Sequence, residues 1–227
     1  GVEVIWNGEH GREEWDTYLK RIIELSNTNT TGTLIIENQI PLGKGMGSST
    51  ALVIAVARAL LGDDCKEAAL RIEDIVNSGH SGLDFAVIWN NEPTVYEQAS
   101  GPRPADVDIE LRGAFLIDTG QPSETTAELV AWMKERESDV KEALEAIGKC
   151  TERLLAGEDI CTVIRDHHRA QILLGIVPEK AKSLITKIEQ QGGAAKIIGA
   201  GGRTESGGMV LALGGDRDTM EDPVIML

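Results

Sequence analysis

The chain has few aromatic residues and no long apolar run, and each shortage excludes a class of protein. Tryptophan, tyrosine and phenylalanine make up 4% of the 227 residues, so the core must rest on Ile, Leu, Val and Ala. No apolar stretch approaches the ~20 residues that span a bilayer. Residues 1–20 carry charges throughout, which argues against a secretory signal.

Cysteine and positive charge are also scarce. Cys65, Cys150 and Cys161 are odd in number and form no CxxC pair, so we expect a reduced, cytoplasmic protein without a zinc site. The 22 basic residues stand against 37 acidic ones, for a net charge of −15. This balance argues against nucleic acid and against anionic membranes as partners. An anionic substrate would therefore need local donors and Mg²⁺.

A glycine-rich loop stands between an expected strand, Leu34 to Ile36, and an apolar segment, 51–61, that predicts a buried helix. The loop reads Gly43-Lys44-Gly45-Met46-Gly47-Ser48-Ser49-Thr50. Free N–H groups and the positive dipole end make such a helix N-terminus suited to an anion. The pattern is neither a Walker loop nor a dinucleotide fingerprint. A plain glycine turn capped by serine remains the alternative.

The remaining pattern predicts an α+β chain in two lobes. We expect further helices at 13–25, 66–77, 124–136, 138–155, 159–173 and 179–191. We expect further strands at 2–6, 107–111, 114–117, 196–198 and 209–213, and a hairpin formed by 86–89 and 94–97. Gly101-Pro102-Arg103-Pro104 is expected to be a linker, which divides the chain into domains 1–105 and 106–227.

Two further constellations carry polar chemistry or glycine. Ser81-Gly82-Leu83-Asp84 follows the expected helix that contains Glu73 and Asp74. Taken alone, Asp84 is equally consistent with a solvated turn. Lys196-Ile197-Ile198-Gly199-Ala200-Gly201-Gly202 forms a second glycine-rich loop near the end of the chain.

These residues resemble the GHMP small-molecule kinases, whose namesakes act on galactose, homoserine, mevalonate and phosphomevalonate. Pro41 to Ser49 resembles their phosphate-binding motif, and 196–202 resembles their late glycine loop. Mevalonate kinases carry a Pro-Ser-Gly-x-Asp segment with a glutamate eleven residues before the aspartate, which matches Asp84 and Glu73. His80 replaces the proline. The resemblance spans about residues 33–213.

The resemblance implies a GHMP-kinase-like fold, with a shortened N-terminal α/β lobe that binds ATP and a ferredoxin-like α+β C-terminal lobe. It implies Asp84 as the catalytic base, Ser49 and Glu73 as ligands of Mg²⁺, and contacts to the acceptor substrate from His80, Ser81 and Gly82. The residues that it assigns to ATP are Gly43, Lys44, Gly45, Gly47, Ser48, Ser49, Gly199, Gly201 and Gly202.

The implied activity is ATP-dependent phosphorylation of a small-molecule hydroxyl, foremost mevalonate to 5-phosphomevalonate in isoprenoid synthesis. The alternatives are a kinase for phosphomevalonate, homoserine or a sugar, and a nucleotide-binding regulatory protein that no longer catalyses. We expect the chain to lack the family's lysine-bearing N-terminal motif, and we interpret the match of Gly8-Glu9-His10 to a family triplet as chance. Residues 203–206 are an insertion that forms either a lid or a surface loop. Exposed strand edges in the first lobe predict a homodimer.

Overall fold

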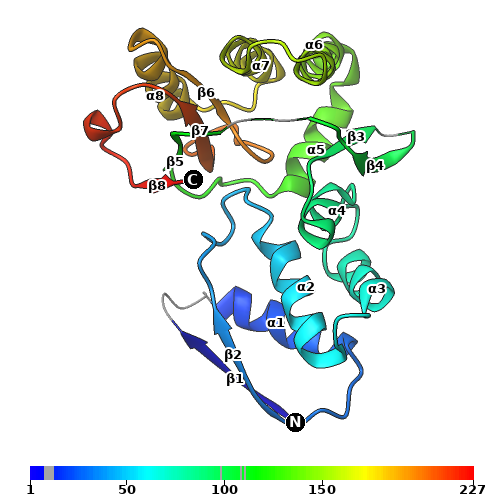
Figure 1. Cartoon of the computed structure of the whole chain (residues 1–227). Helices are drawn as coiled ribbons and strands as arrows, with labels where there is room; N and C mark the ends of the chain where they lie inside the picture. The colour runs from blue at the N-terminus through cyan, green and yellow to red at the C-terminus, as the bar shows by residue number, and fades with distance from the viewer. Residues whose placement is uncertain (8–12, 98, 108, 110) are drawn as a thin grey trace. The chain divides into compact units, whose positions relative to one another are not determined.

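The computed structural model describes residues 1–7, 13–97, 99–107, 109 and 111–227, and it divides into two units. The first unit contains 1–42 and 47–105, and the second contains 43–46 and 106–227. The chain therefore enters the second unit for four residues of the first glycine loop and returns at Gly47 (Figure 1). The triplet Gly8-Glu9-His10 lies outside the described residues. Within those residues, no helix is both long and apolar enough to cross a membrane.

The first unit places helices against a small parallel sheet. Its elements are β1 (Val2–Asn7), α1 (Glu13–Leu25), β2 (Gly32–Glu37), α2 (Ser48–Leu61), α3 (Lys66–Val76), α4 (Leu83–Asn90), β3 (Thr94–Glu97) and β4 (Gly101–Pro104). β1 pairs in parallel with β2, Val4 opposite Leu34, and alternate side chains of both strands pack toward the helices. The core contains Leu19, Val53, Ile72 and Phe85.

Residues 86–89 are helical, so the prediction of a first hairpin strand there is wrong. Gly82, with φ 81°, precedes α4, and Asn91, with φ 53°, ends it. The rings of Phe85 and Trp89 stack with centroids 5.6 Å apart, as four-residue spacing on one helix face allows. β3 instead pairs with β4, the segment that we expected to be a linker.

The second unit is built on a four-stranded antiparallel sheet in the order β6-β7-β5-β8. Its elements are β5 (Ala114–Asp118), α5 (Thr126–Glu135), α6 (Glu137–Leu155), α7 (Ile160–Leu174), α8 (Glu179–Gln190), β6 (Ala194–Ile197), β7 (Met209–Leu213), a 3₁₀ turn (Arg217–Thr219) and β8 (Val224–Met226). Ile185 and Ile188 of α8 pack on one face of the sheet, and Ile164 of α7 packs on the other. β8 forms in a segment where the sequence pattern predicted no strand. The strand expected at 107–111 is absent at its described positions, 107, 109 and 111.

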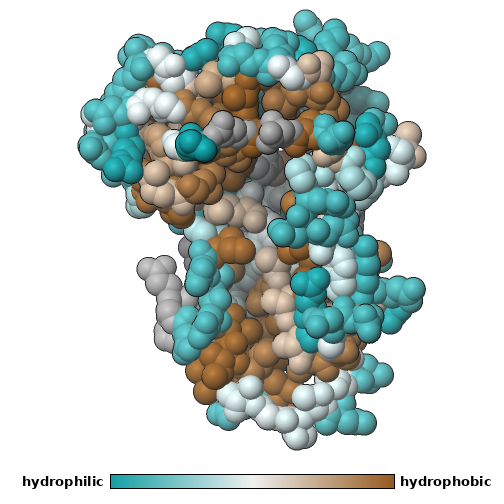
Figure 2. All heavy atoms as spheres, viewed as in Figure 1, coloured by the Kyte–Doolittle hydropathy of each residue, from teal (hydrophilic) through white to brown (hydrophobic). Residues whose placement is uncertain are grey.

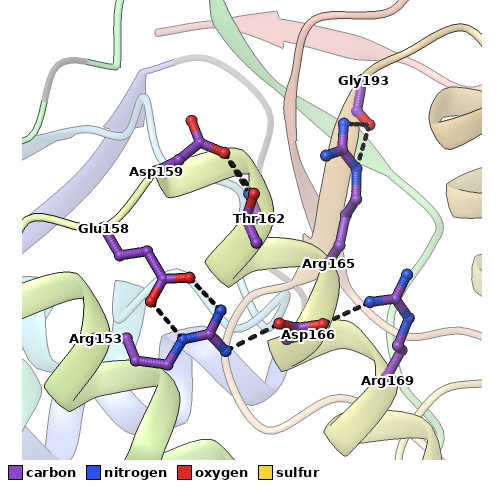
Figure 3. Close-up of polar contacts among 8 residues, drawn as sticks. All are labelled: Arg153, Glu158, Asp159, Thr162, Arg165, Asp166, Arg169 and Gly193. Carbon is purple, nitrogen blue, oxygen red and sulfur yellow. Dashed lines mark hydrogen bonds and ion pairs between the residues drawn. The ribbon is translucent and has the colours of Figure 1, made fainter.

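An ionic network fixes the corner between α6 and α7 (Figure 3). Arg153 pairs with Glu158 and, at 2.9 Å, with Asp166, whose other oxygen accepts from Arg169 at 2.5 Å. On the same helix, Arg165 donates to the carbonyl of Gly193 at 2.8 Å. Because Gly193 immediately precedes β6, this contact fixes α7 against the strand that leads into the second glycine loop.

Candidate active site

The first part of the candidate site is the first glycine loop and the N-terminus of α2 that follows it in the chain. Gly47 precedes the helix with φ 67°, and Gly43 and Gly45 also take positive φ, at 71° and 79°. When residues with positive φ alternate with residues of negative φ, successive backbone N–H groups point into one concavity, which suits an anion. A Cβ on Gly47 would lie 3.6 Å from the carboxyl carbon of Asp84. The Asp84 carboxyl therefore lies beside the start of α2, at ordinary van der Waals distance from this position.

Glu73 lies beneath the same helix end and is 1% exposed. Its Oε1 accepts a hydrogen bond from the Thr50 hydroxyl at 2.7 Å, whereas its Oε2 is buried without a partner. A buried carboxylate oxygen without a partner is costly, and a bound cation would compensate it. The neighbouring Asp74 points elsewhere, since its side chain is 60% exposed and contacts His80.

The donor set fits a magnesium ion that is shared with a phosphate. Among the described residues, no group of three His, Cys, Asp or Glu side chains could hold a metal alone. Magnesium commonly takes one or two carboxylates and completes its shell with substrate phosphates and water. Glu73 Oε2 and the hydroxyl of Ser49, one residue before Thr50, suit this arrangement.

Asp84 occupies the first turn of α4, where the helix dipole favours a negative charge. Asp84 is exposed by its surface area, yet the protein around it raises the pKa of the carboxyl above its ordinary value through desolvation. A positive charge on His80, if the ring were protonated, would oppose this rise. A carboxylate with a raised pKa is a stronger base than a free aspartate, as proton abstraction from a hydroxyl requires.

His80, Ser81 and Gly82 order the turn that presents Asp84. His80 Nδ1 accepts the N–H of Gly82 at 3.0 Å, so Nε2 carries the proton and donates to Asp74 at 2.8 Å. The Ser81 hydroxyl accepts the N–H of Leu83 at 3.2 Å. These contacts give His80 a role in the loop that the replaced proline would otherwise fill. That His80, Ser81 and Gly82 contact the acceptor substrate stays a prediction.

Sequence reasoning missed three residues that support the helix end. Thr50 binds Glu73, as described, and the Tyr18 hydroxyl donates to the carbonyl of Ser49 at 3.4 Å. Asn77 donates to the same hydroxyl at 2.8 Å. Burial and the charge of Glu73 raise the pKa of Tyr18 well above its ordinary value, so Tyr18 remains a neutral donor. The hydroxyl after Ser48-Ser49 was a signal for Thr50, whereas nothing in the sequence singled out Tyr18.

The second part of the candidate site lies in the second unit, where Gly43–Met46 meets the late glycine loop. A Cβ on Gly199 would lie 2.7 Å from the Cα of Gly45, so two glycines are needed where these segments touch. The carbonyl of Lys44 accepts the N–H of Met209 at 3.3 Å. The Lys44 ammonium forms an ion pair with Asp118 at the end of β5.

The other glycines of the late loop serve packing. Gly201 is buried, and a Cβ there would lie 2.4 Å from the carbonyl oxygen of Ile176. The same oxygen accepts the N–H of Gly202 at 3.1 Å. Gly199, by contrast, is exposed. A phosphate contact is therefore geometrically simplest at Gly199, and it stays a prediction for all three glycines.

The inserted residues 203–206 lie along α5. The guanidinium of Arg203 stacks 4.4 Å from the ring centre of Trp132, and the backbone N–H of Arg203 donates to the Glu124 carboxylate at 3.3 Å. Thr204 contacts Ser123. Of the two interpretations of this insertion, these contacts favour a surface loop over a lid that carries the charge of Arg203.

Sequence similarity to known proteins indicates the family to which the chain belongs. The sequence profile described as "GHMP kinases N terminal domain" matches residues 17–90. The chain is 30% identical over 210 residues to a protein named mevalonate kinase of Archaeoglobus fulgidus, which covers 86% of the chain and 69% of the relative. It is 26% identical over 247 residues to one of Thermococcus onnurineus, which covers 96% of the chain and 72% of the relative.

Solved structures share the fold at lower identity. A protein titled "Phosphotransferase related to CoA biosynthesis pathway" matches with a TM-score of 0.63 at 14% identity, over 99% of this chain and 77% of that one. Galactokinase from Lactococcus lactis complexed with galactose matches with a TM-score of 0.62 at 15% identity. The match covers 93% of this chain and 74% of that one. These likenesses confirm the expected α+β GHMP-kinase-like fold. The chain belongs to the GHMP kinase family, whose members are ATP-dependent phosphotransferases.

Proposed function

We propose that the chain transfers the γ-phosphoryl group of ATP to the hydroxyl of mevalonate and forms 5-phosphomevalonate. One observation carries the chemistry: the Asp84 carboxyl lies beside Gly47 at the N-terminus of α2, whose first turn binds the buried Glu73 through Thr50. A base, a carboxylate for a cation and a helix end for phosphate thus meet in one unit. The choice of mevalonate rests on the names of the relatives at 26% to 30% identity.

The residues divide the work of phosphoryl transfer. Asp84 accepts the proton of the substrate hydroxyl while that oxygen bonds to the γ-phosphorus and the bond to the bridging oxygen of ADP breaks. The backbone N–H groups of residues 45–48 hold the phosphates in position. Glu73 and Ser49 would hold Mg²⁺, which supplies neutralisation of phosphate charge when it is bound.

An apolar cavity of about 360 Å³ in the first unit suits the adenine base. This volume lies in the range of small-molecule sites. The cavity adjoins the phosphate loop at Leu42 and Ser48, and Asn38 and Gln39 supply polar groups for the base edge. Its apolar wall comes from β2 and α2: Leu34, Ile36, Ala51, Leu52, Ala55, Val56 and Ala59.

A transfer assay tests the proposal directly. The chain is incubated with γ-labelled ATP, Mg²⁺ and, separately, mevalonate, phosphomevalonate, homoserine or galactose. We expect label in 5-phosphomevalonate, formed on the order of 10²-fold or more slowly by the Asp84→Asn variant. Transfer to another acceptor would keep the kinase and replace the substrate. Binding of Mg·ATP without transfer to any acceptor would favour a regulatory nucleotide-binding protein.

The first unit also presents an apolar sheet face, visible over β1 and β2 in Figure 2. Ile5 is 43% exposed and Ile35 is 55% exposed, on adjacent parallel strands. In the described part of the chain each strand has one neighbour, which leaves an edge for another strand. We propose a homodimer through this face. Light scattering over a dilution series tests it: Ile35→Lys should give monomers, and a wild-type chain that is monomeric throughout would contradict it.

A further inference from the structure

The segment Gly43–Met46 is held in the second unit mainly by its backbone. The Lys44 carbonyl accepts from Met209, and Gly45 lies in close contact with Gly199. The Lys44 side chain, 26% exposed, extends from this fixed backbone to Asp118. The ammonium can therefore change partner without moving the loop.

The Asp118 carboxylate uses its two oxygens for different purposes. Oδ1 accepts the N–H of Gly120 at 2.9 Å and so orders the turn after β5. Oδ2 pairs with Lys44. The turn requires only an acceptor, which an asparagine also provides, whereas the ion pair requires the negative charge.

This pairing neutralises a cation in the loop that binds phosphate. The chain carries a net charge of −15, so a triphosphate approaches an unfavourable overall field and depends on local positive charge. Lysine presents a compact charge on a flexible stem and binds phosphate as a point charge. Asp118 and a nucleotide phosphate thus compete for the same ammonium.

We propose that Asp118 is a counter-ion that lowers nucleotide affinity, because Lys44 must leave it before binding phosphate. The inference rests on the proposed function, since it concerns the same nucleotide site. It assigns Asp118 as a residue that sets affinity through Lys44, apart from the acceptor bond to Gly120.

The test measures dissociation constants for ATP and for adenosine by calorimetry. Asp118→Asn keeps the acceptor for Gly120 and should tighten ATP binding about three- to tenfold, the range of a partly exposed ion pair. Adenosine, which lacks phosphate, should bind unchanged. Asp222→Asn is the matched control, because Asp222 pairs with Lys180 at 2.7 Å in the same unit and is similarly sheltered, at 23% exposed. It should change neither constant.

A second variant ties the effect to Lys44. Lys44→Met should weaken ATP binding and leave adenosine binding unchanged, and adding Asp118→Asn to it should give less than about a twofold gain. Circular dichroism establishes folding of each variant, and if Asp118→Asn fails to fold, an unchanged ATP constant in Lys44→Met overturns the inference.

The outcomes separate this inference from the proposed function. Wild-type protein that binds ATP, with an Asp118→Asn variant that binds it equally or more weakly, overturns the inference alone and makes Asp118 a structural or metal-binding residue. Wild-type protein that binds no ATP overturns the proposed function, and the inference with it.

Discussion

The candidate site residues of the first unit differ in kind from those of the second unit. In the first unit the contribution consists of functional groups: the carboxylates of Asp84 and Glu73 and the hydroxyl of Thr50 around the start of α2. In the second it consists largely of missing side chains, because Gly199 and Gly201 have backbone atoms where a Cβ would stand. Substitutions that preserve shape should therefore damage the first unit's part most, and substitutions that add volume should damage the second unit's part.

The largest effect is expected from Asp84→Asn, which keeps the shape of the side chain and removes the proposed base. We expect kcat to fall on the order of 10²-fold or more, with ATP binding retained. In the wild-type enzyme, kcat should fall as pH drops through the raised pKa of Asp84, at higher pH than for an ordinary aspartate, because the protonated acid accepts no proton. Steady-state kinetics over pH measures both. A near-normal kcat in the variant would remove Asp84 from the mechanism.

Gly201→Ala tests the second half of the comparison. The new Cβ would lie 2.4 Å from the Ile176 carbonyl oxygen at a φ of 78°. Gly192→Ala is the matched control, with φ 86° and nothing within 4 Å of the new atom. We expect a loss of about 3 kcal/mol in unfolding free energy for Gly201→Ala and about 1 kcal/mol for the control. Urea denaturation measures both, and equal losses would show that the loop yields to the added atom.

Acid should weaken the second unit through a buried histidine. Burial lowers the pKa of His168 to about 4, so between pH 6.5 and 4 the unfolded chain binds more protons than the folded one. The free energy of unfolding therefore decreases as pH falls through this window, and at pH 5 it is about 2 kcal/mol lower than at neutral pH. His168→Leu should reduce the loss between pH 7 and pH 5 by that amount. An unchanged pH slope in urea denaturation would exclude His168 as the cause.

Two adjacent acidic residues give the finest test. Glu73→Gln still accepts from Thr50 but loses the charge, so the Mg²⁺ concentration for half-maximal rate should rise about tenfold. Asp74→Asn, whose side chain faces solvent and His80, should leave this concentration unchanged. Equal shifts from the two variants would contradict the assignment of the cation to Glu73.

Local patterns in the sequence predicted much of the architecture. The helix at 13–25 and the strand at 209–213 are confirmed at their predicted bounds. α4 was misassigned because Val87, Ile88 and Trp89 favour strands, whereas the glycine before it and the asparagine after it carried the helix signal. Local propensity was outweighed there by the packing of Phe85 in the core.

In the candidate site, local contacts could be predicted from the sequence, whereas contacts between distant residues could not. Helical geometry indicates that Glu73 and Asp74 cannot both face the serines, and the structure buries Glu73 and exposes Asp74. Lys44 and Asp118 form a pair although they are 74 positions apart, and no pattern in either segment predicts the contact. Such contacts follow from the tertiary fold, so periodicity and spacing do not reveal them.

The excursion of Gly43–Met46 into the second unit has a consequence for how the protein is made and dissected. On the ribosome this tetrapeptide emerges long before Asp118 and Met209, so it must wait for its partners while the rest of its neighbourhood folds. A cut between residues 105 and 106 would leave Gly43–Met46 on the N-terminal fragment, apart from the rest of the second unit. The two pieces should then regain a complete first glycine loop only when they are mixed and reassociate.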